Sequence, residues 1–184
     1  MGLYCTLKSA TFAQLTELRA NSDLLPMFYD PEHADQLMPR PNWFARFFGR
    51  RTVVPEVLKD QSMCMEVDLD KTWDGLNYLL TRVAPNIKAA AFLKEGGTQL
   101  SRNARALSPE EVATFRELIH AVSNAQLRAF FDPAAMTAEG IYPKIIWERE
   151  GEEAFDWLSE FHQHLWAFLR DAVAEGHGCV IWIS

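Results

Sequence analysis

The sequence predicts an α+β protein, a mostly helical single domain with a small sheet that includes the N- and C-terminal strands. Residues 2–8 and 178–183 are short segments rich in β-forming residues, and the interval between them carries helical periodicity and helix start signals. The two terminal strands can pair only after the helical middle has folded over them. That order is typical of an α+β domain, and 184 residues suffice for one substantial core.

Capping boxes predict where three helices begin. Thr11, Ser108 and Ser123 are each followed three residues later by Gln or Glu, so side chain and backbone can satisfy each other's free donors. At Ser108 a proline also occupies the first helical position, which strengthens that start. After the last of these helices, Asp132-Pro133 is expected to begin a further short turn.

The first strongly periodic helix is predicted over Val67 to Val83. Asp68 or Asp70 can cap its start, and Pro85 stops it. Its apolar residues recur at spacings of three and four and so share one face: Leu69, Trp73, Leu76 and Leu80. We therefore expect Trp73 to lie in the core.

The longest helix is predicted over Glu152 to Glu175. Its apolar stripe is widened by Trp157 and Trp166. Residues 148–175 hold eight acids and two arginines, a local charge of −6. A rigid helix with this charge attracts a basic protein, although the same acids can serve only as a solubility surface. Glu153 and Asp156 are the predicted partner contacts.

A flap rich in proline, arginine and aromatic residues is predicted at about 39–59. Five basic residues and one acid give it a local charge of +4, against −11 for the remainder. Arg46, Arg50 and Arg51 alternate with aromatic residues, and one short helical turn is expected around residues 43–48. Such a segment can contact a partner, a membrane surface or single-stranded nucleic acid. Alternatively its aromatics cover the core while its arginines face water.

Composition excludes several classes of protein. With 48% hydrophobic and 23% charged residues, the chain is neither disordered nor collagenous. The net charge of −7 disfavours binding to nucleic acid. No apolar run is long enough to span a membrane, and no basic segment followed by an apolar one marks a signal peptide. The three cysteines have neither disulfide nor zinc spacing, so we expect a reduced, cytoplasmic protein.

Familiar catalytic motifs are missing from the sequence. Gly96-Gly97 is not followed by Lys-Ser/Thr, so it is no phosphate loop, and there is no Gly-x-Ser-x-Gly nucleophile motif. His162 and His164 point to different sides of a helix and cannot grip one metal. No catalytic residue, metal or cofactor is therefore predicted.

Several segments together resemble the YfbM-like family, small bacterial proteins classed as a domain of unknown function. They span nearly the whole chain, and the matching pieces are Met1-Gly2, residues 67–81, residues 104–112, Leu127 through Asp132-Pro133, Ile141-Tyr142-Pro143 and residues 178–184. The family usually has His after the Gly-Leu of the 67–81 segment, where this chain has Asn77. The resemblance implies an α+β fold and a cytoplasmic bacterial protein, and it implies no activity.

Two functions remain as predictions. The first is a non-enzymatic interaction protein, such as an inhibitor or immunity-type binder of a basic partner, without nucleic-acid or membrane binding. The alternative is a small-molecule-binding protein or an unrecognised hydrolase, with a cleft near the start of the 67–83 helix, where free backbone donors and polar groups can meet a ligand. The predicted ligand residues are Asp70, Lys71, Trp73, Asp74 and Tyr142.

Overall fold

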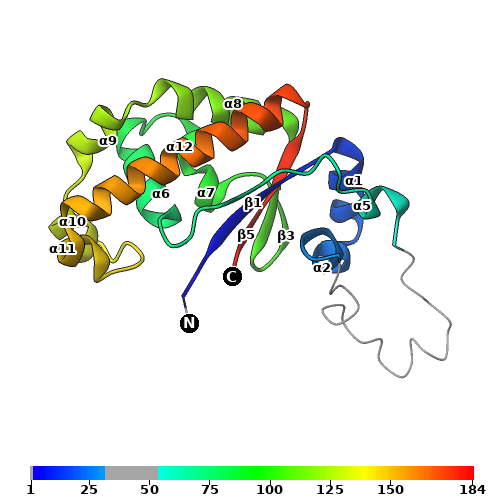
Figure 1. The fold of residues 1–184 in the computed structure, drawn as a ribbon, viewed down its shortest axis with the longest axis horizontal. Helices are drawn as coiled ribbons and strands as arrows, with labels where there is room; N and C mark the ends of the chain where they lie inside the picture. The colour runs from blue at the N-terminus through cyan, green and yellow to red at the C-terminus, as the bar shows by residue number, and fades with distance from the viewer. Residues whose placement is uncertain (1, 32–53) are drawn as a thin grey trace.

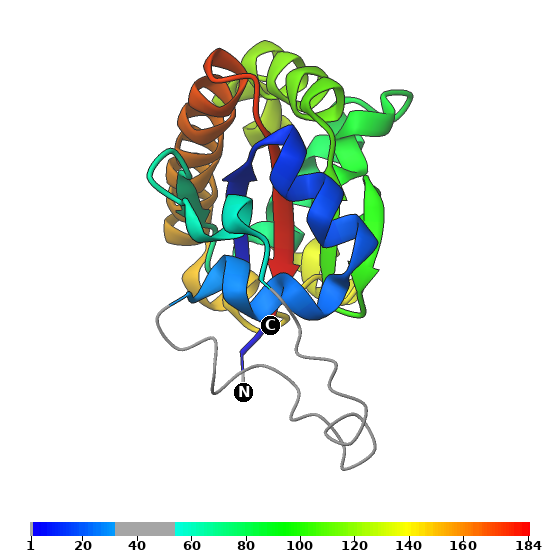
Figure 2. The ribbon, with the colours of Figure 1, turned by 90° about the vertical axis from the view of Figure 1, so that its right-hand side faces the viewer.

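The described part of the chain, residues 2–31 and 54–184 of a computed structural model, places a sheet between two layers of helices. Figure 1 shows the sheet edge-on, with the long helix α12 on one side and α1, α2 and α5 on the other. Figure 2, turned by 90°, shows α1 and α2 in front of the strands. The mostly helical α+β architecture is confirmed.

Within the described residues the sheet has five antiparallel strands in the order β2-β1-β5-β4-β3. Their bounds are β1 Cys5–Ala10, β2 Glu66–Asp68, β3 Thr98–Ser101, β4 Ala104–Leu107 and β5 Gly178–Ile183. The two terminal strands lie at the centre and pair with each other, with Thr6 opposite Trp182. The predicted pairing of the chain's ends is therefore confirmed.

The α-helices of the described ranges are α1 Phe12–Ala20, α2 Leu25–Tyr29, α5 Glu56–Lys59, α6 Trp73–Val83, α7 Phe92–Glu95, α8 Pro109–Ala121, α9 Asn124–Phe130, α10 Pro133–Ala138, α11 Ile146–Glu150 and α12 Glu152–Ala174. Two 3₁₀ helices, η1 Ser22–Leu24 and η2 Lys88–Ala91, precede α2 and α7. Capping boxes close the starts of α1, α8 and α9, as the sequence predicts. The predicted turn at Asp132-Pro133 is α10, where Asp132 caps the first turn.

Each face of the sheet has its own core, because side chains alternate along a strand. Leu7 and Ile181 point toward α6, α8 and α12 and join the larger cluster. Ala106 and Val180 point the other way and pack with buried leucines of α1 and α5. Successive residues of a central strand therefore point to opposite faces of the sheet, and each face packs against a separate layer of helices.

The predicted start of the helix at 67–83 and the predicted apolar side of α12 were both partly wrong. The segment expected to begin a helix at Val67 instead forms β2, and α6 starts at Trp73. The N-cap residue Thr72 does not cap the helix with its side chain, because its hydroxyl donates to the carbonyl of Leu69 at 2.6 Å. Asp68 does not cap α6, because its carboxylate accepts the backbone N–H of Asp70 at 2.7 Å. Trp157 does not widen the apolar stripe of α12, because it is 43% exposed.

The flap predicted at 39–59 is described only from residue 54 onward. There, α5 packs beside α1 and α2 through the buried side chain of Leu58. The predicted helical turn at 43–48 and the arginines Arg46, Arg50 and Arg51 lie outside the described residues.

Candidate functional site

A tight turn positions the start of α6 beside the first residues of the chain. Asp70 adopts a left-handed backbone conformation, with φ of 48°. Its carbonyl accepts the N–H of Cys5 at 3.1 Å, and the N–H of Leu69 donates to the carbonyl of Cys5 at 2.8 Å. These bonds continue the β1–β2 pairing to its end and bring the predicted ligand residues next to Leu3 and Tyr4.

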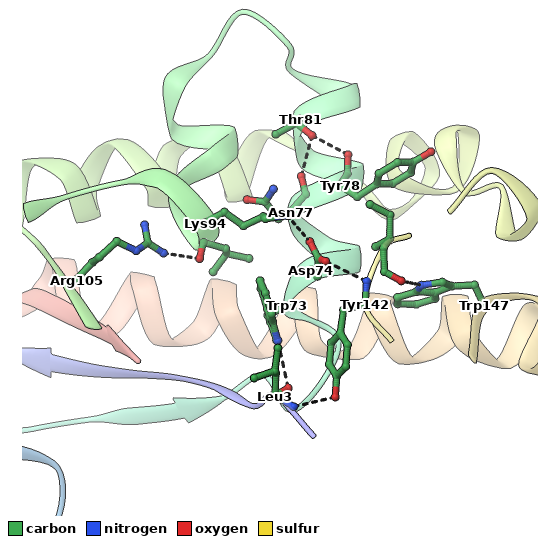
Figure 3. A network of polar contacts seen from close by, with 12 residues as sticks. Leu3, Trp73, Asp74, Asn77, Tyr78, Thr81, Lys94, Arg105, Tyr142 and Trp147 are labelled. Atoms are coloured by element: carbon green, nitrogen blue, oxygen red, sulfur yellow. Dashed lines mark hydrogen bonds and ion pairs between the residues drawn. The ribbon is translucent and has the colours of Figure 1, made fainter. Parts of the chain in front are cut away.

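Asp74 joins three segments that are distant in the sequence (Figure 3). Its Oδ1 lies 2.9 Å from Nζ of Lys94 on α7, and its Oδ2 accepts the backbone N–H of Tyr142 at 3.0 Å. The Asp74 side chain is 9% exposed and that of Lys94 is 41% exposed. A buried carboxylate requires such partners, so both oxygens of Asp74 are committed to holding α6, α7 and the Tyr142 loop together.

Trp73 and Tyr142 close over the beginning of the chain (Figure 3). The indole Nε1 of Trp73 donates to the carbonyl of Leu3 at 3.3 Å, and the hydroxyl of Tyr142 accepts the N–H of Leu3 at 2.8 Å. The two rings lie 6.3 Å apart between centroids. The structure thus brings Trp73, Asp74 and Tyr142 together, as predicted for a ligand site, and it engages their polar atoms with the protein itself.

Asp70 and Lys71 lie beside this network. Nζ of Lys71 is 5.2 Å from the ring centroid of Tyr4, a cation–π contact. Oδ1 of Asp70 and Oδ1 of Asn77 are buried, and neither has a hydrogen-bond partner in the described part of the chain. These two buried oxygens lack a partner within the described ranges, and the predicted ligand-binding role of the five residues stays a prediction.

The exposed side of α12 is a second candidate site, which we call the acidic stripe: Glu153, Asp156, Trp157 and Glu160. All four are exposed, and their spacing puts them on one side of the helix. In the described ranges, Glu153 and Asp156 form no ion pair. Their neighbour Glu152 is neutralised by Arg128 on α9, which reaches both of its carboxylate oxygens at 2.6 Å. The stripe therefore keeps its negative charge around an exposed indole.

A groove that sequence reasoning missed lies on the opposite face of the sheet. It has a volume of about 420 Å³, and its described lining residues are Thr6, Pro26, Tyr29, Glu66, Trp182 and Ser184. The alternation along 178–183 could have indicated which strand residues face this side. Nothing local in the sequence places Tyr29 beside Trp182.

Other features of the described residues bear on function. No helix among them is long and apolar enough to cross a membrane. Within the same ranges, no group of three His, Cys, Asp or Glu residues is arranged to hold a metal ion. Burial raises the pKa of the Cys5 and Cys179 thiols well above the ordinary value, which keeps both cysteines in the unreactive protonated form.

Comparison with known proteins gives a family and a fold. The model of a family described as domain of unknown function (DUF1877) matches residues 1–182. Among solved structures, the chain is similar to YfbM from Escherichia coli, a protein of unknown function, with 17% sequence identity and a TM-score of 0.66. That alignment covers 98% of this chain and 99% of the other. No curated protein matches the sequence.

Proposed function

The chain belongs to the DUF1877 family of YfbM-like proteins, and we propose that it is a non-enzymatic binding protein whose acidic stripe docks a basic protein partner. The observation that carries this proposal is the exposed Trp157, 43% accessible, beside the carboxylates of Glu153 and Asp156, which have no ion-pair partner among residues 2–31 and 54–184. Tryptophan is enriched among the residues that dominate binding energy at interfaces. Surrounding charge steers the encounter with a partner of opposite sign.

The rigidity of α12 supports the same proposal. The helix runs for 23 residues. Its buried side, which includes Leu158, Leu165 and Leu169, belongs to the larger core cluster and packs against α8, α6 and β5. A stripe on such a helix is fixed in position before the partner arrives, so little conformational entropy is lost on binding. The proposed binding includes the role of an inhibitor or immunity-type protein.

The alternative function, a ligand site or hydrolase at Trp73, Asp74 and Tyr142, has less support. Both oxygens of Asp74 already accept hydrogen bonds, from Lys94 and from the N–H of Tyr142, so a ligand there would share an oxygen with one of these structural contacts. The Oδ1 atoms of Asp70 and Asn77, unpartnered among the described residues, favour a ligand, but both are buried. We therefore rank protein binding first.

A cytoplasmic, bacterial setting is part of the proposal. It is supported by the likeness to an Escherichia coli protein and by the free thiols of Cys5, Cys64 and Cys179. Unpaired cysteines are usual where the compartment is reducing.

Affinity capture with matched variants tests the docking proposal. The full chain, the double reversal Glu153→Lys/Asp156→Lys and the control reversal Asp23→Lys/Glu117→Lys are each used to capture proteins from a bacterial lysate, and the captured proteins are identified by mass spectrometry. Asp23 and Glu117 are also exposed and belong to other elements, η1 and α8. We expect a basic protein that the wild type and the control retain and the stripe variant loses. Capture of no protein, or of a protein that all three chains retain, contradicts the proposal.

A further inference from the structure

The helices on the α2 side do not cover the whole face of the sheet. The groove lies at the end of the sheet that they leave partly uncovered. Thr6 and Trp182 are opposite each other in β1 and β5, and both are half-buried. The next pair on the same face, Lys8 and Val180, is buried beneath α2. The groove therefore begins where the cover by α2 ends, and it reaches the sheet itself.

Two aromatic rings form a fixed wall of this groove. The rings of Tyr29 and Trp182 meet edge to face, with centroids 4.5 Å apart. The hydroxyl of Tyr29 donates to the carbonyl of Val180 at 3.0 Å, which holds the ring in place. The wall is therefore preorganised, and it presents π surface to whatever enters the groove.

Carboxylates and one lysine lie together on this face, and Lys8 is directly opposite Glu66 in the β1–β2 register. Glu66 lines the groove, and Asp68 lies opposite Thr6 in β2, so its side chain shares the same face. Lys8 also lies on this face, but its Nζ donates to the carbonyl of Phe28 at 2.9 Å and to Oε1 of Gln61 at 2.6 Å. In the described part of the chain, no cation pairs with Glu66.

We propose that this groove binds a small organic cation, with the apolar part of the ligand against Trp182 and Tyr29 and its ammonium group at Glu66. A volume of about 420 Å³ lies in the range of small-molecule sites, which combine apolar walls with a few polar groups. Aromatic rings attract cations through their electron-rich faces, and a nearby carboxylate adds to that attraction. The site is independent of the acidic stripe, which lies on the far side of the sheet.

Titration of the ¹⁵N-labelled full chain tests this site through its tryptophan signals. The chain has six tryptophans, and the spectrum of Trp182→Phe identifies the indole N–H of Trp182. The probes are phenethylammonium and 2-phenylethanol, which match in shape and differ in charge. We expect a saturable shift of the Trp182 signal with phenethylammonium, and about tenfold weaker binding of the neutral probe.

Two charge-neutralising variants complete the experiment. Glu66→Gln is expected to weaken phenethylammonium binding about fivefold, as for loss of an exposed ion pair. Glu153→Gln, the same change on the acidic stripe, is expected to leave it unchanged. Equal affinity for the two probes, no effect of Glu66→Gln, or no saturable shift with phenethylammonium overturns the proposal. None of these results bears on the acidic stripe.

Discussion

Lys8 and Arg105 are side chains whose positions are fixed by hydrogen bonds to backbone carbonyls distant in the sequence. Both are buried, and both are held largely by carbonyl oxygens at the ends of short helices. Lys8 donates to Phe28 at the end of α2, and Arg105 donates to Phe92, Leu93 and Gly96 around α7. Free carbonyls at a helix C-terminus attract cations. Burial lowers the pKa of Arg105, and these carbonyls compensate for its lost hydration.

The sequence could not predict these partners, because backbone carbonyls carry no residue-specific signal. The same holds for Asp74, which the sequence marks only as an acid near a helix start. Its contacts with Lys94 and with the N–H of Tyr142 depend on how three separate segments meet. The prediction that Trp73 is buried succeeded, because helical periodicity is a local property: the residue is 6% exposed.

Trp73→Ala is expected to lower the free energy of unfolding by ~3–5 kcal/mol, the range for truncating a large buried aromatic residue. The variant also loses the hydrogen bond from the indole to the carbonyl of Leu3. Denaturant melts measure the change. Trp157→Ala is the matched control, since Trp157 is 43% exposed, and we expect a loss of no more than ~0.5 kcal/mol there. Equal losses in the two variants contradict this account of Trp73.

His162 is expected to make stability depend on pH. The side chain is buried between α8 and α12, and its Nε2 has no hydrogen-bond partner among the described residues. Burial lowers the pKa of His162 because the charged ring loses hydration. In the unfolded chain a histidine titrates near pH ~6.5. The contribution of neutral His162 to the free energy of unfolding is therefore fully present above that pH. It declines as the pH falls below it.

Denaturant melts of the wild type and of His162→Leu, between pH ~7.5 and pH ~5, isolate this effect. For the uptake of one proton, the free energy of unfolding can change by at most ~1.4 kcal/mol per pH unit. Other groups titrate in the same range and contribute equally to both chains. We expect the wild type to lose more stability than the variant as the pH falls. Identical pH dependences would show that His162 takes up its proton without cost in the folded state.

At the scale of elements, helix starts with a local sequence signal were predictable, and the short strands β2 and β3 were not. The capping boxes at Thr11, Ser108 and Ser123 all begin helices. By contrast, β2 and β3 are three and four residues long, too short for an alternation that the sequence alone would reveal. β2 exists because it pairs with β1, a contact between residues about 60 positions apart.

Gly75→Ala is expected to destabilise the protein although alanine favours helices. A Cβ at Gly75 would lie 2.5 Å from the buried ring of Trp147, which packs on this side of α6. The helix gains ~0.5–1 kcal/mol from the substitution, and forced overpacking costs ~1–3 kcal/mol. Thermal or denaturant melts should therefore show a net loss. A variant as stable as the wild type would mean that Trp147 moves aside freely.

At the scale of the whole molecule, the two helical layers leave separate surfaces for binding. The layers themselves are visible in Figures 1 and 2. The acidic stripe lies on the exposed side of α12 in the larger layer, and the groove lies beside α2 in the smaller one. The negative charge of residues 148–175 was visible in the sequence, whereas the ion pair of Glu152 with Arg128 was not. Among the described residues, Glu153 and Asp156 remain exposed without an ion pair, and we propose that they face the partner.

The salt dependence of association tests the docking proposal most directly. Binding of the captured basic partner to the wild type and to Glu153→Lys/Asp156→Lys is followed by surface kinetics at several salt concentrations. Because opposite charges speed encounter and salt screens them, we expect the reversal to slow association and to flatten its salt dependence, with little change in stability. Kinetics that the reversal leaves unchanged, but that Arg46→Ala, Arg50→Ala and Arg51→Ala abolish, would contradict the account and assign binding to the flap.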